Sequence, residues 1–134
     1  MEIIVEKTNG LPIQQSAIEI VERKGLGHPD TLCDRAAEEL SIAFSKYYLE
    51  RFGRVLHHNI DKCLLVGGRS EVCFGGGKVT TPMHLIVVGR AVELVGKEKV
   101  PLEEIARETT YRWLKERLRF IEPEKNVIVE TRIR

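Results

Sequence analysis

The hydrophobic pattern of this 134-residue chain changes period along its length, and the order of those changes constrains the fold more than any other feature. Segments rich in β-branched residues predict four strands, at residues 16–24, 62–73, 83–94 and 126–133. Apolar residues at spacings of three and four predict helices at residues 31–52 and 101–118. The order strand–helix–strand–strand–helix–strand predicts an α+β sandwich, in which two helices cover one face of a four-stranded sheet.

The predicted helices carry their own start and stop signals. Asp30 can cap the start of the first helix, and Gly53 can close its end in a left-handed turn. Pro101 suits the first position of the second helix, and Pro123 ends that region. These signals support one domain that spans residues 1–134.

The strand predicted at residues 83–94 is apolar on both sides. One side carries Ile86, Val88 and Val92, and the other carries Leu85, Val87 and Ala91. Because the two helices cover only one face of the sheet, the other face would be a larger apolar patch than a lone domain tolerates. We therefore expect that face to pack against another subunit or another domain.

Composition narrows the possible classes of function. Lysine plus arginine number 21 and aspartate plus glutamate number 20, a net charge of +1, which argues against a nucleic-acid-binding face. No apolar run approaches the ~20 residues of a membrane helix, and Glu2, Glu6 and Lys7 interrupt any signal-peptide core. The three cysteines are widely spaced and form no metal-binding pair, so we expect reduced thiols and a cytoplasmic location.

The turn before the first helix, G-L-G-H-P-D at residues 25–30, holds the most chemistry. Its glycines let the backbone approach a ligand, and the start of a helix attracts phosphate. His28 can donate a hydrogen bond to an anion, and Asp30 is a hard oxygen ligand that suits Mg²⁺. A purely structural explanation also stands, and it is preferred for this turn taken alone: the glycines make the turn, Pro29 starts the helix and Asp30 caps it.

A second polar stretch, H-H-N-I-D-K at residues 57–62, precedes a predicted strand. Adjacent histidines point to opposite sides of an extended chain, so a shared zinc ion is disfavoured. A pocket wall built from Asn59, Asp61 and Lys62 is the better hypothesis.

Glycines mark two further positions. The pair Gly67-Gly68 predicts a bulge or a close backbone approach within the strand at 62–73. The loop F-G-G-G-K at residues 74–78 could approach a phosphate, but a hairpin tip is the preferred explanation. His84 lies in an apolar strand and is expected to be a satisfied core histidine.

Five short motifs occur in series along nearly the whole chain, at residues 18–30, 57–62, 65–68, 74–77 and 89–91. In this order and spacing they resemble the S-adenosylmethionine synthetase (methionine adenosyltransferase) family, in its archaeal-type branch. The resemblance implies an enzyme that joins ATP and L-methionine, assisted by Mg²⁺ and K⁺, and releases phosphate and diphosphate. It also implies subunits with three domains of this same plan, which pair through sheet faces with active sites between them.

The resemblance also implies roles for individual residues. His28 would contact the triphosphate near the ribose and stabilise the departing oxygen, and Asp30 would bind Mg²⁺. Glu22 would lie near the methionine end of the site. Further candidates for substrate contacts are Lys24, Asn59, Asp61 and Lys62.

The sequence departs from the family in extent. Family members continue from the last predicted strand into a Gly-Gln-Gly-Ser nucleotide loop and two further domains, which are absent from these 134 residues. We therefore expect the chain to correspond to the N-terminal domain only, to lack full activity alone, and to form a homo-oligomer or to join a partner chain that carries the missing domains. The alternatives are a catalytically silent relative, acting as a dimerising or regulatory subunit, or a nucleotide-binding subunit.

Overall fold

A computed structural model describes residues 2–7 and 9–134 and shows an extended arm followed by a folded body. We define the arm as residues 2–7 and 9–28, and the body as residues 29–134. Within the described arm the one regular element is a short 3-10 turn, η1 (Ile13–Gln15). The helices of the body are α1 (Pro29–Phe52), α2 (Leu102–Arg117) and α3 (Pro123–Asn126). None of the helices described is long and apolar enough to cross a membrane.

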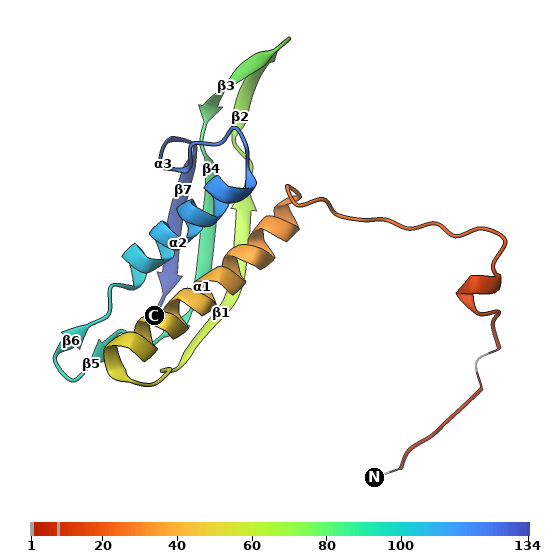
Figure 1. The fold of residues 1–134 in the computed structure, drawn as a ribbon, viewed down its shortest axis with the longest axis horizontal. Coiled ribbons are helices and arrows are strands. Elements are labelled where there is room, and N and C mark those ends of the chain that lie inside the picture. The colour runs from red at the N-terminus through yellow and green to blue at the C-terminus, as the bar shows by residue number, and fades with distance from the viewer. Residues whose placement is uncertain (1, 8) are drawn as a thin grey trace.

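The central sheet of the body has three strands in the order β1–β4–β7 (Figure 1). Their bounds are β1 (His58–Val66), β4 (Met83–Ala91) and β7 (Val127–Ile133). β1 runs antiparallel to β4, with a bulge between Ile60 and Lys62, and β4 runs parallel to β7. The parallel pair is joined through α2, as a crossover connection requires.

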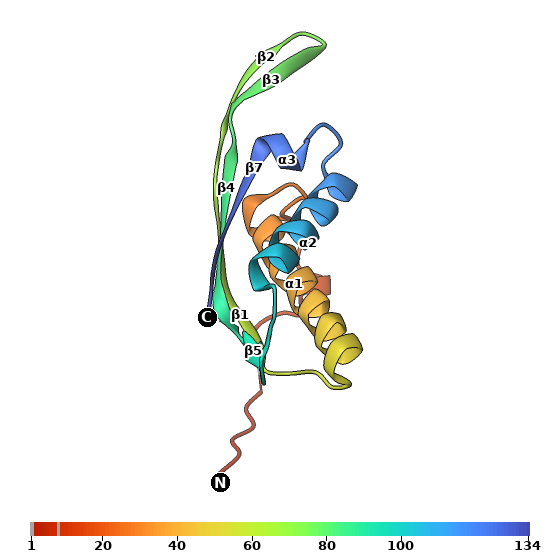
Figure 2. The ribbon, with the colours of Figure 1, turned by 90° about the vertical axis from the view of Figure 1, so that its left-hand side faces the viewer.

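Two hairpins extend from this sheet. β2 (Arg69–Cys73) and β3 (Gly76–Thr81) continue beyond β1 and β4 as a projecting ribbon (Figure 2), whereas β5 (Leu94–Val95) and β6 (Glu98–Lys99) form a short hairpin before α2. The predicted strand at 62–73 is therefore two strands. A Cβ atom on Gly68 would collide with the carbonyl oxygen of Thr81, which confirms the predicted close approach of the backbone. Gly75, with φ of 79°, lies in the predicted hairpin turn.

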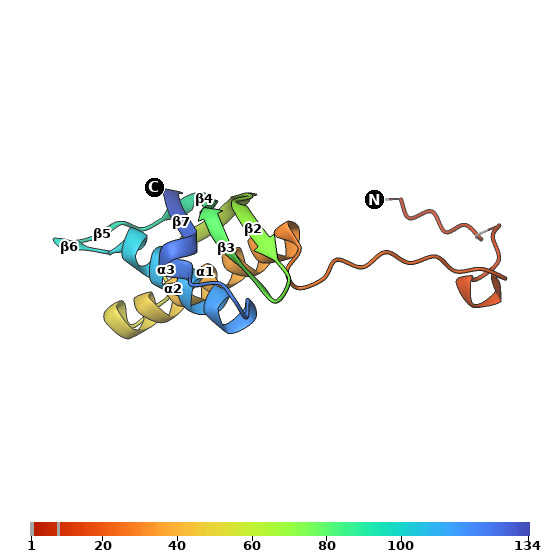
Figure 3. The ribbon, with the colours of Figure 1, turned by 90° about the horizontal axis from the view of Figure 1, so that it is seen from above.

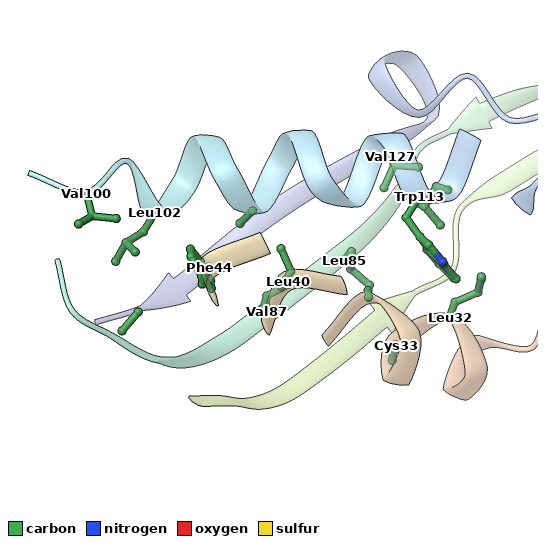
Figure 4. Close-up of a cluster of buried hydrophobic side chains, with 14 of the residues drawn as sticks. Leu32, Cys33, Leu40, Phe44, Leu85, Val87, Val100, Leu102, Trp113 and Val127 are labelled. Atoms are coloured by element: carbon green, nitrogen blue, oxygen red, sulfur yellow. The ribbon is translucent and has the colours of Figure 1, made fainter. Parts of the chain in front are cut away.

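Both long helices pack on one face of the sheet, which Figure 2 shows edge-on. We call the face beneath α1 and α2 the covered face. In Figure 4, Leu40 and Phe44 of α1 meet Leu85 and Val87 of β4 in the space between the layers. The buried apolar residues are Leu32, Cys33, Ala36, Leu40, Phe44, Tyr48, Leu85, Val87, Ala91, Val100, Leu102, Ala106, Trp113, Leu114 and Val127. The prediction of two helices on one face is confirmed.

The other side of the sheet, which we call the open face, has no helix over it (Figure 2). Its exposed apolar side chains are Leu64 (59% exposed), Val66 (48%), Val88 (38%) and Ile128 (52%), and they surround half-buried Ile86. The strand register pairs Leu64 with Ile86, which places both on this face. The predicted two-sided apolar character of this strand is therefore confirmed.

The strand predicted at residues 16–24 is wrong for the described chain. This segment is extended but belongs to none of the sheets, so the central sheet has three strands rather than four. Alternating β-branched residues favour an extended backbone, but a strand forms only where a neighbouring strand accepts its hydrogen bonds. In the body, the outer edge of β1 has no neighbour among the described residues.

Candidate functional site

The start of α1 gathers three polar side chains of the predicted site. His28 caps the helix: its Nδ1 accepts a hydrogen bond from the backbone N–H of Asp30 at 3.1 Å. The backbone N–H of His28 donates to the carbonyl oxygen of Gly25 at 3.0 Å, which closes the turn before the helix. Asp30 was predicted to be the cap, and this was wrong by two positions because Pro29 occupies the first helical turn and leaves the cap to His28.

Lys24 forms an ion pair with Asp30 across this turn. The carboxylate Oδ2 of Asp30 also lies 3.9 Å from Nδ1 of His28. The hydrogen bond and charge of Lys24, followed by His28, lower the pKa of Asp30, and Asp30 in turn raises the pKa of Lys24. Both side chains are more than half exposed, so a ligand in solution can reach them.

These groups can bind an anion at the helix start. Because Nδ1 accepts a hydrogen bond, the neutral ring of His28 carries its proton on Nε2, which leaves one N–H donor free. The positive end of the α1 dipole adds to the attraction of a phosphate oxygen. Asp30, held ionised, provides an oxygen that suits a hard divalent cation. The purely structural explanation of this turn, in which the imidazole caps the helix and Lys24 pairs with Asp30, stands beside an anion site at the free Nε2–H.

The three residues of the predicted pocket wall lie elsewhere in the chain. Asn59 and Lys62 pair with Arg90 and Val88 of β4 and are exposed, and Asp61 occupies the bulge of β1. With Val88 on the open face, the register places Asn59 and Lys62 there too, across the sheet from α1.

His58, at the start of β1, contacts Ser41 and Ser45 of α1. From there β1 runs back toward the start of α1, where Cys63 is hydrogen-bonded to Cys33. None of the hydrogen bonds and ion pairs among the described residues joins Asn59, Asp61 or Lys62 to His28, so their substrate contacts stay predictions.

Glu22 lies on the arm, two residues before Lys24, and is exposed. The hydrogen bonds and ion pairs found among the described residues do not include its carboxylate. Its predicted position near methionine therefore stays a prediction.

The adjacent histidines point to opposite sides, as expected. His57 is exposed, whereas His58 is half-buried with Nδ1 2.9 Å from the carbonyl oxygen of Leu56. Its Nε2 lies 3.2 Å from Oγ of Ser41 and 3.3 Å from Oγ of Ser45, so both ring nitrogens have partners. Across the described residues, no group of three metal-ligating side chains converges. His58 thus joins α1 to β1 and is a structural residue.

His84 is not the core histidine that the sequence predicted. It is about one-third exposed on the open face, with Nε2 2.9 Å from Oε2 of Glu130. Arg132 donates a hydrogen bond of 2.7 Å to the same carboxylate, and this bond lowers the pKa of Glu130. Sequence inspection missed this cluster, although the alternation Glu130-Thr131-Arg132 in the last strand places both charges on one face.

The glycine-rich loop at residues 74–77 is the tip of the β2–β3 hairpin, as preferred. Lys78 forms an ion pair with Glu71 at 3.0 Å, and Phe74 is fully exposed. The loop joins two strands and has no helix start beside it, so the hairpin tip is the better explanation.

Two of the cysteines, buried Cys33 and half-buried Cys63, are also structural. Cys33 of α1 and Cys63 of β1 are hydrogen-bonded between the helix and the sheet. Burial raises the pKa of both thiols, to about 12 for Cys63, so neither is ionised near neutral pH.

Comparisons with known proteins agree with these features. A family model described as S-adenosylmethionine synthetase (AdoMet synthetase) matches residues 1–134. The chain is 48% identical over 132 residues to a probable S-adenosylmethionine synthase of Aquifex aeolicus. It is 47% identical over 135 residues to the S-adenosylmethionine synthase of Aeropyrum pernix, and 45% identical over 136 residues to that of Hyperthermus butylicus.

Each of these matches covers 98% of this chain and 33% of the relative. The chain therefore spans about a third of the length of the curated relatives that it matches. The match of the family model to residues 1–134, together with the identity to these relatives, shows that the chain belongs to the S-adenosylmethionine synthetase family.

Proposed function

We propose that this chain forms the amino-terminal part of a methionine adenosyltransferase, which converts ATP, L-methionine and water into S-adenosylmethionine, phosphate and diphosphate. One observation carries the proposal: an imidazole, a carboxylate and an ammonium group meet at the exposed start of α1. The reaction displaces a triphosphate from a ribose carbon, and charge develops on the departing oxygen. Groups that bind this oxygen more strongly as its charge grows lower the barrier.

His28 is the proposed donor to the triphosphate. Its Nδ1 is held by the N–H of Asp30, which fixes the orientation of the ring and leaves Nε2–H free for a phosphate oxygen. Lys24 lies next to it and would exchange part of its contact with Asp30 for a contact with phosphate. The helix dipole acts in the same direction as these two donors.

Asp30 is the proposed protein ligand for Mg²⁺. Mg²⁺ is commonly held by one or two carboxylates together with substrate phosphates, so a single ionised carboxylate beside a phosphate site fits this ion. When bound, Mg²⁺ would neutralise charge on the triphosphate. The described residues offer no comparable set of oxygen ligands that we can assign to K⁺, which remains implied by the family alone.

The remaining substrate contacts would come from a second copy of the chain. Asn59 and Lys62 lie on the open face, and this face is an apolar surface without cover. A homodimer through the open faces would bury that surface and bring the polar residues of one subunit toward the other. Glu22 and Asp61 would complete the methionine end of the site. The alternative role of this chain, as a dimerising subunit, would use the same open face.

The test is to fuse residues 1–134 to the remaining two-thirds of the Aquifex aeolicus relative and to measure S-adenosylmethionine formed from ATP and methionine with Mg²⁺ and K⁺. We expect the fused enzyme to turn over and the 134-residue chain alone to make little product. The variant His28→Ala should lower kcat of the fused enzyme about 10²- to 10³-fold, because a donor to the developing charge is lost.

The matched control is His57→Ala, which removes an exposed histidine outside the helix start. It should leave the rate of the fused enzyme unchanged. Equal rates for the His28→Ala variant and the unaltered fused enzyme would contradict the proposed role of His28.

A further inference from the structure

The arm contains a strand-like segment that is exposed to solvent. In residues 17–24, Ile18 is 78% exposed, Ile20 is 91% exposed and Val21 is 71% exposed. Burial of such side chains against a partner is favourable, and exposed apolar segments of this kind mark interaction sites. The segment therefore has the composition of a buried strand, but its apolar side chains are exposed to solvent.

The backbone of this segment is also unpaired. The hydrogen bonds from Ser16 to Ile13 and from His28 to Gly25 form turns on either side of it. Between those turns, residues 17–24 form no backbone hydrogen bond with another described residue and no sheet pairing. An extended segment whose donors and acceptors are all free is able to add to the edge of a sheet.

The path of the arm leads away from the body. Figures 1 and 3 show the arm leaving the start of α1 and running outward, so the free edge of β1 is not its partner in this chain. The matched relatives offer a partner, because about two-thirds of their length lies outside the part that this chain matches.

We propose that residues 17–24 form a strand of a sheet that belongs to the polypeptide corresponding to the remaining two-thirds of the relatives, whether that polypeptide is fused to this chain or separate. Main-chain hydrogen bonds would give affinity, and Ile18, Ile20 and Val21 would fill apolar positions. The proposal concerns assembly, so it stands whether or not the proposed reaction is correct.

This strand addition would also position part of the candidate site. Glu22 and Lys24 lie at the end of the segment, and Lys24 is six residues from Asp30. Once residues 17–24 are fixed in a sheet, the backbone on both sides of the Gly25–His28 turn is anchored, and Lys24 is held beside Asp30 and the proposed phosphate site. The helix start and the end of the arm then act as one rigid unit.

Hydrogen–deuterium exchange tests the proposal on two proteins, the 134-residue chain alone and the fusion to the remaining two-thirds of the Aquifex aeolicus relative. In the chain alone, we expect the amides of residues 17–24 to exchange at the rate of an unfolded peptide. In the fusion, we expect them to exchange about 100-fold more slowly or better, since sheet hydrogen bonds must open first. The double variant Ile18→Asp, Ile20→Asp should remove that protection and lower the Tm of the fusion.

The matched control is Val72→Asp, which changes an apolar residue that is 83% exposed on the β2–β3 hairpin. It should leave the protection of residues 17–24 intact. Protection of these amides in the 134-residue chain alone would overturn the proposal, because the partner would then be its own β1 edge or a second copy. Fast exchange in the fusion would overturn it as well.

Discussion

The two faces of the β1–β4–β7 sheet carry similar side chains, yet helices cover only one of them. On β4, Leu85 and Val87 point to the covered face and are buried, while Ile86 and Val88 point to the open face and stay partly exposed. The middle of this strand therefore carries large apolar residues on both sides, although the open side also holds His84. What differs is the layer above each face, which shows that burial in this chain follows from the connections of α1 and α2 rather than from strand composition.

The two faces of the sheet also differ in their polar groups. Polar groups beneath the helices are few. The hydroxyl of Tyr48 donates to the carbonyl oxygen of Val92 at 2.8 Å, whereas Oγ1 of Thr110 and Nε1 of Trp113 have no hydrogen-bond partner among the described residues. The open face instead carries the cluster of His84, Glu130 and Arg132 beside its apolar residues. A face that combines an apolar centre with charged edges is typical of a surface between protein subunits.

The largest effect should follow from a change under the helices. Phe44 is fully buried on the covered face, so Phe44→Ala removes a large side chain and leaves a cavity in the core. We expect a loss of about 3–5 kcal/mol in the free energy of unfolding, measured by urea denaturation. The control Phe74→Ala, at the fully exposed hairpin tip, should stay within about 0.5 kcal/mol of the unaltered chain. Equal losses for both variants would mean that the covered face is not the core.

A charge on the open face should affect association rather than folding. Ile86 lies on the central strand, paired with Leu64 and Glu130. We expect the unaltered chain to sediment as a dimer at micromolar concentration and Ile86→Lys to sediment as a monomer, with unfolding changed by less than about 1 kcal/mol. Val72→Lys on the projecting hairpin is the control and should remain dimeric. A clean monomer of the unaltered chain would refute pairing through this face.

The smallest effect concerns the charged edge of the open face. The hydrogen bond from Arg132, with a lesser contribution from His84, holds the pKa of Glu130 below its usual 4.5. Because the folded pKa is depressed, the stabilisation is present above about pH 4.5 and is lost as the pH falls through the folded pKa.

We therefore expect Arg132→Gln to move the titration of the Glu130 carboxyl carbon, followed by NMR, to higher pH. Arg119→Gln, which changes an exposed arginine beside Phe120, is the control. An unchanged titration midpoint in the Arg132→Gln variant would contradict the effect of Arg132 on the pKa of Glu130.

Much of the body could be predicted because its signals are local. The end of α1 at Gly53, with φ of 70°, follows from the left-handed turn that glycine permits. The start of β7 differs from its prediction by one residue. The closeness of His28 and Asp30 follows from the sequence, since only Pro29 lies between them, although which of the two caps the helix does not.

The rest of the site could not be predicted from spacing. Asn59 and Lys62 are polar residues next to a strand, but only the register with Arg90 and Val88 shows that they face away from α1. The exposed position of His84 could not be predicted either, because its partner Glu130 lies on a strand that is distant in sequence. A sequence pattern gives the side of a strand to which a residue points, but not what lies over that side.

The sequence by itself determined the periods of the helices, the end of α1 at Gly53, the hairpin turn and the two-sided apolar strand, since each depends on backbone preferences and neighbours within a few residues. Only the tertiary structure decided that residues 17–24 stay outside the sheet and that one face remains open. The physical reason is that a helix satisfies its own hydrogen bonds, whereas a strand and an apolar face need partners from elsewhere. Whether such a partner is present is a property of the assembled molecule.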